Sequence, residues 1–196
     1  MSIARGIRCG AFLKPGSIRW LAMISDFLIY VPVWLALVGW FVGSFARGRG
    51  VQSSGGMRDT VYGYAWLLGS LMIAFHILAS YGLAHDWSHA AAIEATADES
   101  ERVTGIRAGW GVYVNFVFAT VWMGYSIAMT TRKRRWPAVD QAVFWFTAVI
   151  VFSATIVFET GAVRWLSIAG FTGLIISTLW PRQSPADPDA PVHRPR

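Results

Sequence analysis

The sequence predicts an all-α protein, a polytopic transmembrane helix bundle with five spans. Two features of the composition indicate this class: 55% of the 196 residues are hydrophobic and only 14% are charged. Soluble domains carry roughly 25% charged residues, so this chain has too few to cover a water-facing surface. The third observation is a series of apolar runs that approach or exceed the ~20 residues needed to cross a hydrocarbon layer of ~30 Å. The mean hydropathy of +0.44 agrees.

The first two spans are predicted at 27–45 and 61–84. Pro32 lies inside the first span and removes one helix hydrogen bond, which membrane helices tolerate when neighbours compensate. The connector between the two spans is rich in glycine, serine and arginine, which is typical of a loop. Cys9 precedes the first span and is the only cysteine, so an internal disulfide and a cysteine-based metal cluster are excluded.

The other three spans are predicted at 108–131, 138–158 and 162–180. The segment RKRRWP separates the third span from the fourth, and the short polar turn ETGAVR separates the fourth from the fifth. The fifth span holds only 16 residues from Trp165 onward and reaches 19 if the Arg164 side chain extends to the membrane surface, so a four-span bundle is the alternative. Tryptophan favours the headgroup zone, and seven tryptophans lie at or near the proposed ends: Trp20, Trp40, Trp87, Trp110, Trp136, Trp165 and Trp180.

Two stretches lie outside the predicted spans. Residues 86–104 are rich in alanine and glutamate, which favour helix, and form either a continuation of the second span or a surface helix ending near Gly105. Residues 181–196 hold five prolines and no apolar residue larger than valine. Such a segment cannot build a core, so a disordered tail follows the bundle of residues 1–180.

The formal net charge of +6 is attributed to topology and lipid headgroups rather than to nucleic acid. Ten cations fall on the side of the 47–58 connector, the RKRR segment and the C-terminal tail, and seven on the other side. This difference favours the first side as cytoplasmic, although the basic N-terminal tail favours the opposite orientation. A bacterial-type inner membrane is the expected location.

The motif HDWSH contains His85 and His89, which are spaced i, i+4 and would share one face of a helix. It resembles one histidine box of the membrane fatty-acid desaturases and hydroxylases, a resemblance that implies a di-iron centre. The resemblance covers five residues, and those enzymes need two further histidine-rich boxes. Only His76 and His193 remain in this chain, so the desaturase family is not predicted.

A smaller metal site could use His85, His89 and Glu94, which together offer two nitrogens and one oxygen. Glu94 follows His85 by nine residues, which places it about half a turn away on a straight helix. The site therefore requires a break in the helix or a contribution from another span. The alternative is that both histidines lie at the membrane surface and bind water, lipid or a neighbouring helix.

His76 lies in the middle of the second span, where an ionisable side chain is costly and usually faces the bundle interior. We expect it to bond to a polar group such as Asn115 or Ser153. The alternative is an axial ligand of a haem.

Three carboxylates lie near the predicted span ends. Asp26 is interfacial if the first span begins at Phe27 and intramembrane if it begins at Trp20. Asp140 and Glu159 flank the fourth span and are expected to contact water.

Few polar groups lie inside the spans, so the sequence predicts a non-enzymatic integral membrane protein, an accessory or assembly component. Its expected partners are the lipid bilayer and other membrane proteins or further copies of itself, and no cofactor is expected. One alternative is a metal- or haem-binding redox protein that uses His76, His85 and His89. Another is an oligomeric transporter or channel component with Asp26 or His76 on its path.

Overall fold

A computed structural model describes residues 15–47, 57–132 and 136–179 of the chain. Cys9, Trp180 and the tail predicted at 181–196 lie outside these residues. The described part consists of seven helical segments and contains no strand. In chain order they are α1 (Pro15–Ala46), α2 (Met57–Leu83), α3 (His89–Thr104), α4 (Gly111–Arg132), α5 (Pro137–Phe152), the π-helix η1 (Ser153–Phe158) and α6 (Ala162–Leu179).

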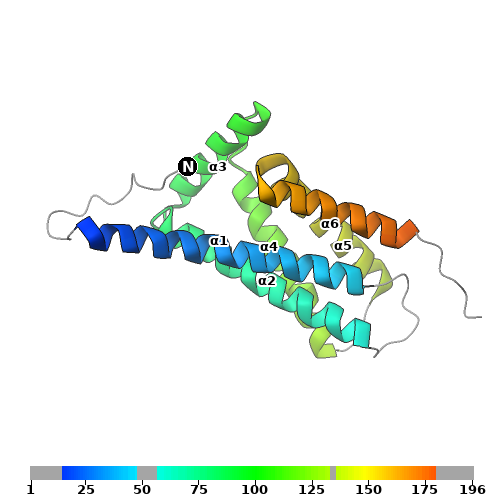
Figure 1. Ribbon diagram of the computed structural model, residues 1–196. Helices are drawn as coiled ribbons and strands as arrows, with labels where there is room; N and C mark the ends of the chain where they lie inside the picture. Colours follow the sequence, from blue (N-terminus) through cyan, green and yellow to red (C-terminus); the bar gives the residue numbers. More distant parts are fainter. Residues whose placement is uncertain (1–14, 48–56, 133–135, 180–196) are drawn as a thin grey trace, which may run out of the picture.

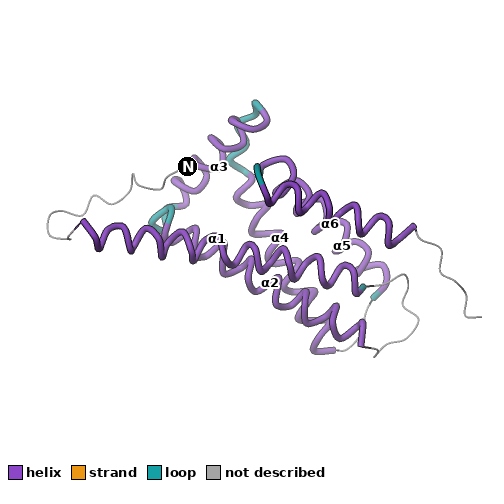
Figure 2. Tube along the Cα trace, viewed as in Figure 1, coloured by secondary structure: helices purple, strands orange, loops and turns teal. Residues whose placement is uncertain are grey.

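Five segments are long and apolar enough to cross a membrane, which confirms the predicted all-α bundle of five spans. They are Met23–Ala46, Met57–Leu83, Gly111–Arg132, Pro137–Phe158 and Ala162–Leu179. The fourth of these combines α5 with η1. Figures 1 and 2 show α1 lying along α2, with α4, α5 and α6 completing the bundle.

The pair α1 and α2 packs closely because glycines face each other across the contact. A Cβ at Gly39 would lie 2.7 Å from the carbonyl oxygen of Ala65 and 2.9 Å from the Cα of Gly69. Any side chain at Gly39 would therefore push the two backbones apart, as expected for small residues at membrane helix contacts.

Tryptophan rings fill the centre of the bundle. Trp40, Trp66 and Trp122 are each at most 1% exposed, and the rings of Trp66 and Trp122 meet edge to face at 6.0 Å. The Trp40 ring therefore faces the core of the bundle and not the headgroup zone. Its indole nitrogen Nε1 donates to Thr147 Oγ1 at 3.0 Å inside the core, which removes the need for a headgroup partner.

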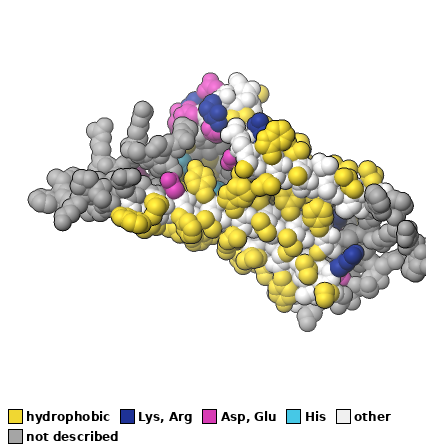
Figure 3. Space-filling model, viewed as in Figure 1, with side chains coloured by type: hydrophobic (Ala, Val, Ile, Leu, Met, Phe, Trp, Pro, Cys, Tyr) yellow, Lys and Arg dark blue, Asp and Glu magenta, His cyan; other side chains and the backbone are white. Residues whose placement is uncertain are grey.

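The helix α3 projects away from the bundle and carries most of the visible charge, whereas hydrophobic side chains cover the spans (Figures 1 and 3). It is a separate surface helix, because Asp86 and Trp87 adopt positive φ angles of 48° and 59° after α2 has ended. The Ser88 hydroxyl accepts from the backbone nitrogen of Ala91 at 3.3 Å, and Gly105 ends the helix with φ of 76°.

Candidate functional site

A buried carboxylate, Asp140, lies in the first turn of α5 at the end of the bundle away from α3. Its side chain is 2% exposed. Tyr62 and Tyr125 each donate a hydroxyl hydrogen bond of 2.7 Å to Oδ1. Arg47 donates from Nε to Oδ2 at 2.8 Å. The expectation that Asp140 contacts water is wrong, because side chains from α2, α4 and the residue after α1 close over it.

The contacts of Arg47 extend this cluster to the rim of the bundle. Its Nη2 donates to Gln141 Oε1 at 2.6 Å, and its guanidinium carbon lies 4.3 Å from the centre of the Phe144 ring. A buried ion pair repays its desolvation only when further hydrogen bonds satisfy both partners. Here such hydrogen bonds are present for both partners. The cluster joins four helical segments, and protein donors bind both oxygens of the carboxylate.

The half of the bundle nearer α3 contains a cavity of about 400 Å³ between α1, α2, α4, the end of α5, η1 and the start of α6. This volume falls in the range of ~300–1,000 Å³ typical of small-molecule sites. Its apolar walls include the rings of Trp34, Trp40, Phe118 and Trp122. The polar groups on the wall are Tyr30, His76, Asn115, Thr155 and Glu159.

A π-helical turn forms part of the cavity wall. The segment η1 supplies Thr155 to the wall and ends immediately before Glu159, which is exposed. Thr155 is occupied locally, since its Oγ1 donates to the carbonyl of Val151 at 2.7 Å. This break in the regular helix therefore coincides with the cavity. Single π-helical turns occur frequently at functional sites.

His76 binds the backbone of α1 rather than either expected side chain. Its Nδ1 lies 2.7 Å from the carbonyl oxygen of Ile29, and the Ser153 hydroxyl donates to its own helix at Val149. Both expected partners, Asn115 and Ser153, are therefore wrong. A carbonyl can only accept, so Nδ1 carries the proton, and Nε2 of the neutral ring is left as an acceptor.

The residues of the predicted metal site are not brought together. His89 binds two tyrosines, Tyr81 through Nδ1 and Tyr113 through Nε2 at 2.9 Å, and Glu94 pairs with Arg107. Partial burial lowers the pKa of His85, which lies just beyond α2. Within residues 15–47, 57–132 and 136–179, no group of three His, Cys, Asp or Glu side chains is placed to hold a metal ion. Metal binding by His85, His89 and Glu94 stays a prediction.

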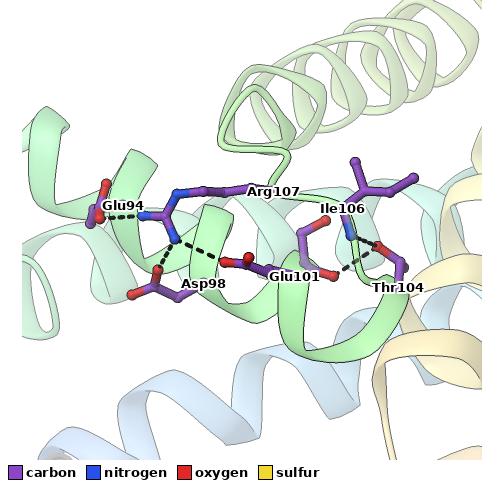
Figure 4. Close-up of polar contacts among 7 residues, drawn as sticks. Glu94, Asp98, Glu101, Thr104, Ile106 and Arg107 are labelled. Carbon is purple, nitrogen blue, oxygen red and sulfur yellow. Dashed lines mark hydrogen bonds and ion pairs between the residues drawn. The ribbon is translucent and has the colours of Figure 1, made fainter.

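Arg107 gathers three carboxylates of α3 (Figure 4). It donates from Nη1 to Asp98 at 2.6 Å and to Glu101 at 3.1 Å, and from Nη2 to Glu94. The hydrogen bond to Asp98, with those to Glu101 and Glu94, raises the pKa of Arg107. All four side chains are exposed, so these pairs stabilise only modestly. They hold the chain that leaves α3 against the helix.

Asp26 is exposed near the start of the apolar segment Met23–Ala46 and does not line the cavity. Comparisons with protein-family models, with curated proteins and with solved structures found no match to this chain.

Proposed function

We propose that the protein is a non-enzymatic accessory component of a bacterial-type inner membrane, and that its central cavity binds a small amphiphilic molecule. The ligand has an apolar, ring-containing body and a hydroxyl or amine donor at one end. Partner membrane proteins or further copies of the chain would interact with the protein in its ligand-bound state. The cation asymmetry between the two sides favours the Asp140 end as cytoplasmic.

One observation carries the proposal: the Ile29 carbonyl fixes the His76 tautomer. Nδ1 lies 2.7 Å from that carbonyl, so the neutral ring offers Nε2 as an acceptor rather than a donor. The Glu159 carboxylate and the Asn115 amide oxygen add further acceptors to the same cavity. A donor-bearing ligand complements them, whereas a ligand with acceptors alone leaves them unpaired.

The use of the other polar groups supports binding rather than catalysis. Asp140 is engaged by two tyrosines and an arginine, and His89 by two tyrosines. A general acid or base must lie within hydrogen-bond reach of a substrate proton. These groups instead contact protein partners that hold the helices together.

Tryptophan fluorescence tests the proposal, because three tryptophans line the cavity. An alkylated hydroquinone should quench the purified protein saturably. Its dimethyl ether, which lacks donors, should bind about two- to tenfold more weakly, the range of one neutral hydrogen bond. Equal affinity for the two probes contradicts the proposal.

Two variants locate the binding. His76→Phe should remove the preference for the hydroquinone, and Ala154→Phe should fill the cavity while leaving the His76–Ile29 bond intact. His85→Phe is the matched control, since His85 belongs to the same part of the chain but does not line the cavity. If the probe binds Ala154→Phe as tightly as the wild type, the cavity is not its site.

The second candidate is a haem- or metal-binding redox protein that uses His76. A histidine whose Nδ1–H donates to a backbone carbonyl is oriented for ligation through Nε2, and His76 has this arrangement. A Soret band, or stoichiometric metal lost in His76→Ala, would favour this candidate. Saturable hydroquinone binding to colourless, metal-free protein would favour the first.

A further inference from the structure

We propose that the half of the bundle near Asp140 carries a binding site for one anionic phospholipid. The site is a groove of about 930 Å³ bounded by α1, α2, α5 and α6. Apolar side chains form most of its walls, including Val42, Phe45, Trp145, Leu174 and Ile175. Trp40 lines both this groove and the central cavity, and the proposal does not depend on the function proposed for that cavity.

The polar end of the groove is cationic. Arg47 and Arg58 both line it. Asp140 neutralises Arg47, whereas Arg58 forms no ion pair within the described parts of the chain. The groove therefore keeps one uncompensated positive charge, which favours an anionic occupant.

Ser44 provides a second, independent indication of a ligand. Ser44 is one of the residues that line the groove and is 7% exposed, and its buried Oγ has no hydrogen-bond partner. A buried hydroxyl without a partner is costly, and rotation of the Ser44 side chain toward the groove would let a phosphate oxygen of the occupant accept from it. Ser44 and Arg58 both line the groove, and the proposed phosphate ester would contact both.

The position and walls of the groove favour a phospholipid over a free anion. Phe45, Trp145 and Ile175 are 47%, 58% and 57% exposed and belong to segments long and apolar enough to cross a membrane, so we expect acyl chains beside them. The polar end lies where α1 ends and α2 begins, at the level of the headgroups. Basic pockets between membrane helices are a known form of lipid recognition.

Native mass spectrometry of the full chain in detergent tests the proposal. Phosphatidylglycerol and phosphatidylcholine with identical acyl chains are titrated separately, and the phosphatidylglycerol is expected to bind more tightly. Arg58→Gln should reduce this preference about fivefold, the value for one cation near a surface. Equal binding of the two lipids by the wild-type chain overturns the proposal.

Arg132→Gln is the control for diffuse electrostatics. Arg132 ends α4 at the same end of the bundle, beside Trp136, but does not line the groove. Its replacement removes the same charge and should leave the lipid preference unchanged. If Arg132→Gln reduces the preference as much as Arg58→Gln, the binding is not at this groove.

Ser44→Ala separates phosphate recognition from charge. Both lipids contain a phosphate ester, so this variant should weaken the binding of each by about two- to tenfold. The ratio of the two affinities should stay unchanged. Ile175→Trp fills the groove and should weaken the binding of both lipids although the cations are intact. If neither variant weakens the binding of either lipid, the phospholipid does not bind in this groove.

Two further results would replace the phospholipid with another occupant. Competition by millimolar glycerol phosphate as effective as that by lipid would indicate a site for free anions. A dimer that persists at saturating phosphatidylglycerol and dissociates in Ile175→Trp would indicate a second copy of the chain. Either result overturns the proposal.

Discussion

Tyr62 and Tyr125, from α2 and α4, donate hydrogen bonds of equal length, 2.7 Å, to the same oxygen of Asp140. Two helices are thereby joined through a carboxylate on a third, and Arg47 binds the other oxygen from the end of α1. A buried charge is tolerated only when paired and hydrogen-bonded. The cluster therefore determines how four helical segments meet at one end of the bundle.

Asp140→Asn should destabilise the bundle by about 3 kcal/mol, because it leaves Arg47 charged and without its ion-pair partner. Reversible unfolding in lipid–detergent mixtures measures this. Glu159→Gln, at the other end of the same span, is the control and should cost under about 0.5 kcal/mol. Equal costs for the two variants would mean that the Asp140 cluster does not stabilise the fold.

Thr147→Val should cost about 1–3 kcal/mol, because it leaves the buried Nε1 of Trp40 without an acceptor. Trp40→Phe should cost more, since it also removes ring packing. The double variant should be less destabilised than the sum of the two, by at least about 0.5 kcal/mol. Strict additivity in the unfolding experiment would rule out the hydrogen bond between them.

Gly39→Ala should destabilise the α1–α2 contact by about 1–3 kcal/mol, as overpacking does. Its Cβ would meet backbone atoms of α2, which cannot move aside. Gly124→Ala is the matched control, because nothing lies within 4 Å of a Cβ there. That substitution should be neutral or stabilising by up to about 1 kcal/mol. The same sign for both would contradict the close approach of α1 and α2.

Acid should loosen α3. The hydrogen bond from Arg102 lowers the pKa of Glu99 in the folded protein, so this pair contributes stability above the ordinary glutamate pKa. That contribution is lost as the pH falls through the lowered value, and it is small because both side chains are exposed. Hydrogen-exchange protection factors of α3 should fall from pH 6 to pH 3, and less so in Arg102→Gln. An identical pH dependence in wild type and variant would remove Glu99 as the cause.

The five spans could be predicted from the sequence because each is a continuous apolar run, a local property. The partners of Asp140 could not, because Arg47 and Tyr62 precede it by 93 and 78 residues. The only local signal was an acid in the first turn of an apolar helix after Trp136 and Pro137. That pattern fits equally well an acid that is exposed to water at a helix N-terminus and stabilised by the helix dipole.

The same limit applies to His76. Its position in the middle of an apolar run predicted that it would face the interior, and it lines the cavity. Its partner is a backbone carbonyl, a group that every residue possesses, so no sequence pattern could identify Ile29. The cavity likewise depends on how five segments fit together.

Nitrogen-15 NMR of His76 in lipid bilayers tests the central claim most directly, because the two ring nitrogens report their protonation separately. The proton should reside on Nδ1, with Nε2 bare, and the Nε2 resonance should shift when alkylated hydroquinone is added but not with its dimethyl ether. A proton on Nε2, or an Nε2 resonance that does not shift when the hydroquinone is added, would contradict the proposed binding site.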